Sequence, residues 1–199
     1  MRQLGLFASA AQPTVLIAEG GDVRYVPEFL DGHAASELVE ELHRSTTWRA
    51  DSRMMYGRRV LVPRETAARG ERCAQDWSPA LLRVRASLEA YLGTAFDYVF
   101  INRYRDGNDS VAWHNDNDAE ADPRRVIASL SLGATRTFEL RPLRSSGRNY
   151  KKIATALAHG DLIVMQGDTQ LNYEHRIPKE PRVDGERINL TFRQYITRP

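Results

Sequence analysis

Cysteine is nearly absent from this 199-residue chain, in which Cys73 is the single example. One thiol excludes an internal disulfide and a zinc site built from cysteines. No apolar run approaches the roughly 18 residues that a membrane-spanning helix needs. The N-terminus has only a very short apolar stretch, whereas a secretory signal needs about 7–15 apolar residues. We therefore expect a cytoplasmic protein with no membrane segment.

Internal repeats, low-complexity tracts and a clear interdomain linker are also missing. With 42% hydrophobic residues, the chain is long enough for one well-buried core or for two small domains. Residues 1–13 have no periodic partner segment and end at Pro13, which predicts a flexible tail. We expect residues 14–199 to form a single domain and the protein to be a monomer.

Net charge is small, at +2, but it is unevenly distributed. From Arg44 to Arg85 the chain has ten arginines and four acidic residues, a local balance of +6. Guanidinium groups bind phosphate oxygens well, so this segment favours a nucleic-acid partner. Taken alone, this local charge is explained equally well by a solvated arginine-rich surface.

Two segments have the apolar spacing and the end residues of α-helices. The first, residues 31–45, begins at Asp31, a good N-cap residue. The second, residues 78–93, begins with a Ser-Pro pair and ends with glycine. The apolar residues that we expect to face the core are Ala35, Leu38, Val39, Leu42, Leu81, Val84, Leu88 and Leu92.

After Gly93 the pattern changes to short strands bounded by Gly, Pro, Asp or Asn. The strand segments are residues 97–104, 125–133, 136–143, 152–160, 161–167 and 187–195. Two helices followed by at least six strands predict an α+β fold. We expect a double-stranded β-helix (jelly roll) with the N-terminal helices packed on one sheet.

The stretch SVAWHNDND, residues 110–118, places His114, Asp116 and Asp118 at alternating positions. On an extended backbone these side chains share one face. His175, in NYEHRIP, offers a second imidazole from a distant segment. Two histidines and one carboxylate are the facial triad of non-haem Fe(II) oxygenases. Taken alone, a His-x-Asp pair in a surface turn explains the first segment as well.

The segment RINLTFR, residues 187–193, has an apolar face and a polar face. The polar face carries two guanidinium groups that flank two hydrogen-bonding groups. This arrangement suits a small dicarboxylate. A solvated face is the alternative, although solvated strands usually include acids and lysines. Asn102 and Tyr104, in VFINRY, share a face that can line the same pocket. The residues on the polar face of RINLTFR are Arg187, Asn189, Thr191 and Arg193.

The order of these motifs resembles the AlkB family of Fe(II)- and 2-oxoglutarate-dependent nucleic-acid dealkylases. The resemblance covers roughly residues 24–195 and is greatest for the branch that repairs alkylated duplex DNA. As an ordered set, the motifs are far more specific than any one of them. They are Asn-Arg-Tyr (102–104), Asp-Gly (106–107), His-x-Asp (114–116), Ala-His-Gly (158–160), His175 and RINLTFR.

The resemblance implies that His114, Asp116 and His175 bind Fe(II). It implies that Arg187 pairs with the distal carboxylate of 2-oxoglutarate, while Arg193 lies near the end that chelates the metal. In the implied reaction, O2 oxidises an N-alkyl group on a base, 2-oxoglutarate becomes succinate and CO2, and formaldehyde is released. The remaining cosubstrate residues would be Asn102, Tyr104, Thr191 and Asn189, the last with a partly structural role.

Residues 54–70 match a family segment that contacts nucleic acid and holds the flipped base. By position, Tyr56 is the aromatic wedge that fills the vacated base stack. Asp118 aligns with an acidic residue that contacts the substrate base, and Asn117 stands where duplex-repair relatives often have an acid. An ordinary surface hairpin is the alternative interpretation of this segment. The residues expected at the phosphates or the opposite strand are Gly57, Arg58 and Arg64.

One departure from the family pattern follows Gly70, where relatives carry a longer stretch with aromatic residues that stack on the target base. Here only ERCAQD separates Gly70 from Trp77. This short segment leaves the identity of the substrate open. Trp113 and Tyr173 are candidates either for stacking on the target base or for packing in the core. The first alternative to DNA dealkylation is oxidation of RNA, a protein or a small molecule. The second is a catalytically idle nucleic-acid-binding module.

The N-terminal pentapeptide QLGLF, Gln3–Phe7, resembles the peptide that binds the bacterial sliding clamp. Such a peptide buries its leucines and phenylalanine in a preformed apolar pocket while the rest of the tail stays flexible. A tail that packs on its own domain is the alternative. The match predicts a sliding clamp as a partner and a bacterial cytoplasmic location.

Overall fold

The computed structural model describes residues 12–55, 57–71, 73, 76–118, 121–144 and 151–195. Its strands form two antiparallel sheets. In spatial order, the larger has β1 (Thr14–Ile17), β2 (Asp22–Val26), β10 (Leu162–Gln166), β7 (Ile127–Gly133), β12 (Arg187–Arg193), β5 (Tyr98–Tyr104), β4 (Arg58–Gly70) and β3 (Arg49–Met55). The smaller has β6 (Val111–His114), β11 (Tyr173–Ile177), β8 (Arg136–Pro142) and β9 (Ile153–Leu157). This double sheet is consistent with the predicted jelly roll.

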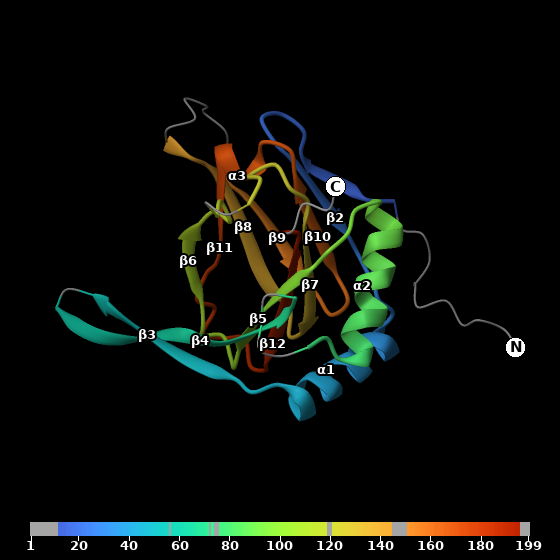
Figure 1. Ribbon diagram of the computed structural model, residues 1–199. Helices are drawn as coiled ribbons and strands as arrows, with labels where there is room; N and C mark the ends of the chain where they lie inside the picture. The colour runs from blue at the N-terminus through green and yellow to red at the C-terminus, as the bar shows by residue number, and fades with distance from the viewer. Residues whose placement is uncertain are drawn as a thin grey trace, which may run out of the picture.

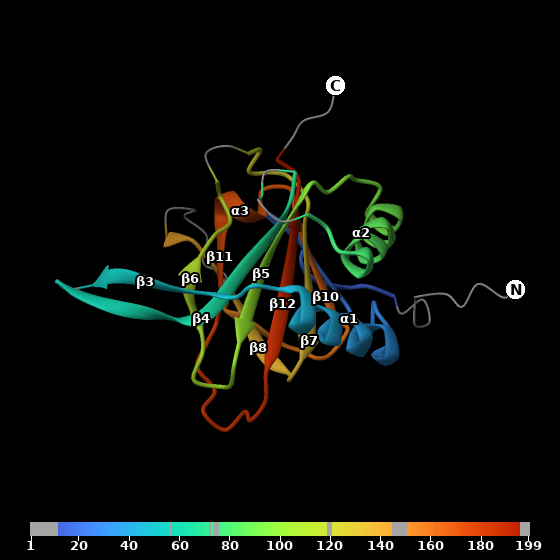
Figure 2. The ribbon, with the colours of Figure 1, turned by 60° about the horizontal axis from the view of Figure 1, so that its bottom comes forward.

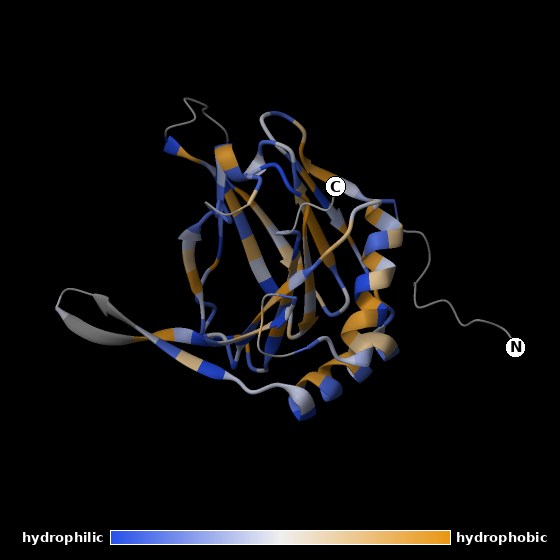
Figure 3. Ribbon diagram, viewed as in Figure 1, coloured by the Kyte–Doolittle hydropathy of each residue, from blue (hydrophilic) through white to orange (hydrophobic). Residues whose placement is uncertain are grey.

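The two predicted helices are present as α1 (Gly32–Ser45) and α2 (Pro79–Leu92), and a short α3 (Thr169–Asn172) precedes β11. The Asp31 side chain accepts a hydrogen bond from the Ala34 amide at 2.8 Å, which caps α1. Ser78 caps α2, and Gly93 ends it in the left-handed conformation at φ 66°. Figure 3 shows hydrophobic residues recurring along α1 and α2. These caps and apolar stripes are the ones that the sequence predicted.

Two apolar clusters lie on opposite faces of the larger sheet. One contains buried residues of α1 and α2 together with Ile188, Leu190 and Phe192 of β12. The other contains residues such as Ile127 and Phe138, between the two sheets. In Figures 1 and 2 α1 and α2 lie beside the larger sheet, on the side away from β6, β11 and β8. The polar face of β12 therefore faces the smaller sheet.

Arg136 joins the loops that border the two strands carrying the histidines. It is 1% exposed and donates to the carbonyls of Asp106, Asp109 and Pro178 at 2.6–2.9 Å. It also pairs with Glu180 Oε2 at 2.9 Å. Residues 106–109 precede β6 and residues 178–180 follow β11, so one buried guanidinium fixes both strand ends.

The Ala-His-Gly motif has a structural role at the turn between β9 and β10. Gly160 has φ 88°, and a Cβ there would collide with the Leu30 carbonyl. The next residue, Asp161, is buried and accepts hydrogen bonds from the amides of Ala158 and Glu28 at 2.7 and 2.9 Å. The motif thus attaches the turn to the segment before α1.

The six predicted segments correspond to β5, β7, β8, β9, β10 and β12, whereas β3, β4, β6 and β11 were not among them, and neither were β1 and β2. These two strands are short, and β2 pairs with β10, which is more than 130 residues away. Such long-range pairing leaves no local pattern to detect. Within the described residues, no helix is both long and apolar enough to cross a membrane.

Candidate metal and cosubstrate site

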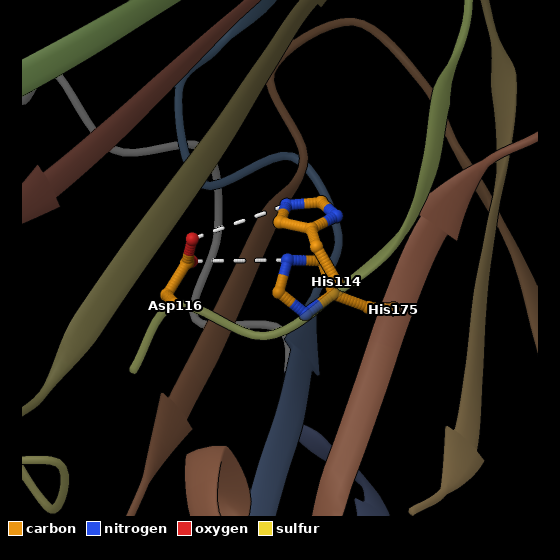
Figure 4. Close-up of side chains that lie close together, drawn as sticks. All are labelled: His114, Asp116 and His175. Atoms are coloured by element: carbon orange, nitrogen blue, oxygen red, sulfur yellow. Dashed lines mark ion pairs between the residues drawn. The ribbon is translucent and has the colours of Figure 1, made fainter. Parts of the chain in front are cut away.

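His114 and His175 are direct cross-strand partners on β6 and β11. Asp116 follows two residues after His114, beyond the end of the strand. His114 Nε2 lies 3.9 Å from Asp116 Oδ1, and His175 Nε2 lies 3.7 Å from Asp116 Oδ2. One ligand atom from each residue lies within 4.8 Å of the others, and Figure 4 shows the carboxylate facing both rings. Two imidazoles and one carboxylate in this arrangement suit a ferrous ion.

A hydrogen bond orients His114, and the surroundings of His175 and Asp116 favour the ionisation states that metal ligands require. His114 Nδ1 lies 2.9 Å from the Ala112 carbonyl, and donation there leaves Nε2 with its lone pair. Burial lowers the pKa of His175 to about 4, so its ring is neutral at physiological pH. Burial opposes ionisation of Asp116, but Arg193 and the neighbouring charges outweigh it and hold the pKa of Asp116 below its usual value.

Three polar side chains hold Asp116 in place. Gln170 Oε1, from α3, accepts a hydrogen bond from the Asp116 amide at 2.7 Å. Arg125 Nη2 donates to the Asp116 carbonyl at 2.9 Å, and Arg193 Nη2 donates to Oδ1 at 2.7 Å. Gln170 and Arg125 were missed by the sequence analysis, because nothing local connects residues 125 and 170 to residue 116.

A cavity of about 370 Å³ lies between the two sheets at this point. Its volume is within the range of small-molecule sites. All the predicted metal and cosubstrate residues line it, together with Asp118 and Arg64. The cosubstrate candidates among them are Asn102, Tyr104, Arg187, Asn189, Thr191 and Arg193.

Arg187 is buried in the wall of this cavity with only part of its hydrogen-bonding capacity used. Its Nη2 donates to Ser131 Oγ at 2.8 Å, but Nε and Nη1 have no partner among the described residues. The Nε of Arg193 is also buried without a described partner. Burial lowers the pKa of Arg187 to about 10, which leaves it charged at neutral pH. Buried, partnerless guanidinium N–H groups fit the two carboxylates of 2-oxoglutarate.

Asn189 and Thr191 lie between the two arginines on β12 and make hydrogen bonds within the protein, while Tyr104 lies on the neighbouring strand β5. Asn189 Nδ2 donates to Ser129 Oγ at 2.8 Å and to the Leu130 carbonyl at 3.1 Å, which ties β12 to β7. Thr191 Oγ1 donates to Asn189 Oδ1 at 3.1 Å. Burial raises the pKa of Tyr104, so its hydroxyl keeps its proton. The Asn189 contacts agree with the partly structural role that the resemblance implied.

The expected substrate residues are distributed over the cavity and the β3–β4 hairpin. Arg64, on β4, and Asp118 line the cavity, whereas Asn117 is exposed and lies outside its lining. Gly57 is in the hairpin turn with φ 75°. Figures 1 and 2 show the β3–β4 hairpin, at the edge of the larger sheet, projecting beyond the other strands. Tyr56 and the side chain of Arg58 lie outside the described residues.

The two stacking candidates lie elsewhere. Trp113 is covered by Arg141 and Arg176, whose guanidinium carbons lie 4.0 and 4.5 Å from its ring centroid. Tyr173 is 4% exposed in the core between the sheets. Neither belongs to the cavity lining, where the aromatic residues are Tyr98, Phe100, Tyr104, Phe138 and Tyr195.

Comparison with known proteins agrees with this geometry. A family model described as the 2OG-Fe(II) oxygenase superfamily matches residues 22–193. The bovine alpha-ketoglutarate-dependent dioxygenase alkB homolog 3 is 35% identical over 188 residues, which cover 87% of this chain and 66% of that protein. Human DNA oxidative demethylase ALKBH2 is 32% identical over 198 residues, covering 90% of this chain and 75% of that protein.

A solved structure, that of OsALKBH1, superposes with a TM-score of 0.65 at 15% identity. The match covers 91% of this chain and 100% of that one, and it shows a common fold. The chain spans slightly less than two thirds of the length of the alkB homolog 3 proteins. The family model and the ALKBH2 match nevertheless cover most of the chain. The protein belongs to the AlkB family of the 2OG-Fe(II) oxygenase superfamily.

Proposed function

We propose that this protein is a dioxygenase that removes alkyl groups from N-alkylated bases in DNA, such as 1-methyladenine and 3-methylcytosine. One observation carries the proposal. The cavity that holds His114, Asp116 and His175 also holds buried guanidinium N–H groups of Arg187 and Arg193 without described partners. A nucleic-acid-binding module without catalysis has no use for this combination. The predicted cofactors, Fe(II), 2-oxoglutarate and O2, are those of the superfamily.

The triad would hold the metal, and the two arginines would hold 2-oxoglutarate. When bound, the metal and 2-oxoglutarate would supply the oxidation of an N-alkyl carbon by O2, with release of succinate, CO2 and formaldehyde. The protein's part is to bind, orient and exclude water. Gln170 and Arg125 fix the backbone of Asp116, and the burial of His175 keeps solvent from one side of the metal position.

Two features support a nucleic-acid substrate. One relative, human ALKBH2, is named as a DNA oxidative demethylase, and its match covers 90% of this chain. The +6 segment from Arg44 to Arg85 includes all of the extended β3–β4 hairpin. We infer that this hairpin contacts the phosphates of DNA whose target base is extruded into the cavity. Tyr56 would then fill the vacated base stack, and Gly57 and Arg58 would lie at the phosphates or the opposite strand.

A panel assay tests the proposal. The protein is incubated with Fe(II), 2-oxoglutarate and oligonucleotides that contain 1-methyladenine or 3-methylcytosine, in single-stranded DNA, duplex DNA and RNA. Product mass and succinate are measured together. We expect base demethylation with one succinate per methyl group removed. The same reaction with His114→Ala protein is the control and should release neither product.

Other outcomes identify the alternatives. Succinate release without base demethylation would favour a protein or small-molecule substrate, which the short segment between Gly70 and Trp77 leaves open. A preference for the RNA oligonucleotides would keep the chemistry and change the substrate. Absence of both succinate and demethylation would favour a catalytically idle module.

The sliding-clamp partner remains a separate prediction, because Gln3–Phe7 lies outside the described residues. A fluorescent peptide of residues 1–12 should bind a bacterial sliding clamp in a fluorescence-polarisation titration. The same peptide with Phe7→Ala should not bind. Equal polarisation curves for the two peptides would end the idea.

A further inference from the structure

Tyr195 lies two residues beyond the end of β12 and lines the cavity. Its backbone amide donates to both carboxylate oxygens of Asp97, at 2.9 and 3.1 Å, and Asp97 is 4% exposed. This buried acceptor fixes the direction of the chain after the last strand. The phenol ring is thereby held at the cavity wall.

The hydroxyl group of Tyr195 connects the metal side of the cavity to Asp118. It donates to Asp118 Oδ2 at 2.9 Å and accepts from Arg193 Nη1 at 3.4 Å. Arg193 in turn donates to Asp116, so the contacts run from a candidate metal ligand to Asp118. Because β6 ends at His114, no strand register fixes the position of Asp118. The Tyr195 hydroxyl is one side-chain contact that orients this carboxylate.

The ring of Tyr195 forms an aromatic corner with Tyr98. Their ring centroids are 5.1 Å apart and their planes lie at 86°, an edge-to-face arrangement. The Arg125 guanidinium carbon lies 5.2 Å from the Tyr195 ring centroid and holds that ring from another side. The cavity wall therefore carries two tyrosine rings beside the carboxylate of Asp118. These rings supply aromatic surface that the short segment after Gly70 does not.

We propose that Tyr195 is a positioning residue for lesion discrimination. Its hydroxyl holds the Asp118 carboxylate at the place where the edge of an alkylated base enters. 1-Methyladenine and 3-methylcytosine carry a positive charge, which a carboxylate and tyrosine rings attract. A neutral base such as 3-methylthymine gains neither attraction. The inference rests on the proposed function and deepens it, because it names the residue that sets the preference among bases.

Tyr195→Phe tests the inference, because it removes the hydroxyl and keeps the ring. Oligonucleotides with 3-methylcytosine or 3-methylthymine are the two substrates. We expect kcat/KM for 3-methylcytosine to fall about tenfold, mainly through KM, as for loss of a hydrogen bond to a charged group. The KM for 2-oxoglutarate and the activity on 3-methylthymine should stay within about twofold. In an Asp118→Asn background, Tyr195→Phe should cause no further loss.

Tyr25→Phe is the matched control. The Tyr25 hydroxyl also donates to a carboxylate, Asp161 Oδ2 at 2.8 Å, but Tyr25 lies outside the cavity lining. This variant should keep the wild-type preference between the two bases. If Tyr195→Phe reduces activity on both bases equally, raises the KM for 2-oxoglutarate to the same degree, or changes nothing, the inference is overturned.

A binding experiment separates the test of this inference from the test of the proposed function. Fluorescence anisotropy, without metal or 2-oxoglutarate, compares the affinity for the 3-methylcytosine oligonucleotide with that for the unmodified one. A wild-type protein that demethylates no oligonucleotide would contradict the proposed function, and anisotropy would then decide the inference alone. A preference for 3-methylcytosine that Tyr195→Phe removes would support it. No preference in the wild-type protein would overturn it.

Discussion

Arg193 donates a hydrogen bond of 2.7 Å to Oδ1 of Asp116, so the proposed cosubstrate arginine and a proposed metal ligand are in direct contact. Arg187, at the other end of β12, contacts Ser131 and the ring of Tyr104 instead. The two arginines are therefore expected to have different effects when they are changed. We expect only Arg193 to couple cosubstrate binding to the metal.

Replacing each arginine by lysine separates the two roles. A lysine keeps the charge but loses the two-pronged geometry that pairs with a carboxylate. Arg187→Lys should raise the KM for 2-oxoglutarate by about tenfold or more and leave metal affinity unchanged. Arg193→Lys should weaken the binding of both. Isothermal titrations with Mn(II) and with 2-oxoglutarate measure the two affinities, and Arg141→Lys, outside the cavity, is the control. Identical effects of the two cavity variants would contradict this division.

Gln170→Ala should weaken metal binding without direct contact to the metal. The change leaves the buried amide of Asp116 without its 2.7 Å acceptor. Loss of a group that orients a ligand typically costs about 10–100-fold in metal affinity. The matched control is Gln166→Ala, whose amide donates to Asp22 outside the cavity. Equal metal affinity for Gln170→Ala and wild-type protein would show that α3 does not position Asp116.

Gly160→Ala should destabilise the fold by about 3 kcal/mol, from a left-handed backbone and a collision with the Leu30 carbonyl. Urea unfolding measures the change. Gly32→Ala is the control, because a Cβ at this position in α1 meets nothing within 4 Å. That variant should be unchanged or more stable by up to about 1 kcal/mol. Similar losses in both variants would argue against a structural role for the Ala-His-Gly turn.

Acid should destabilise the protein partly through Glu180. Burial opposes ionisation of Glu180, but hydrogen bonds from Thr137 and Arg136 outweigh it and lower its pKa below the usual 4.5. Its stabilising contribution is therefore complete above about pH 4.5 and is lost as the pH falls through the lower, folded-state value. Urea unfolding at pH 6 and pH 3.5 should show a smaller decline for Glu180→Gln than for the wild type. An equal decline in both would assign the acid sensitivity to other groups.

The alternation in RINLTFR was enough to predict which residues of β12 meet the core and which meet the cavity. It succeeds because the strand is central and has a different environment on each face. The residue types alone suggested His114, Asp116 and His175 as a triad, and the family resemblance supported it. The cross-strand pairing of His114 with His175 was not predicted, since strand register between distant segments has no local pattern. Arg125, Gln170 and Tyr195 were missed for the same reason. In the folded chain Gln170 and Arg125 contact the backbone of Asp116, and Tyr195 contacts Asp118.

The position of Arg64 also required the three-dimensional structure. From the sequence it belonged with the arginines expected to contact DNA phosphates, and it lines the cavity from β4. Its Nε is buried without a partner among the described residues. Successive side chains point to opposite faces of a hairpin. Arg64 therefore cannot be assigned to the cavity or to the outer surface until the bulge between β3 and β4 is known.

Anaerobic metal titration in the presence of 2-oxoglutarate tests the shared metal site most directly. Wild-type protein should bind one Fe(II) per chain by calorimetry, and His175→Ala and Asp116→Ala proteins with unchanged circular dichroism should bind none at the same concentrations. If both folded variants bind one Fe(II) with wild-type affinity, the iron is held elsewhere, and His114, Asp116 and His175 do not form its site.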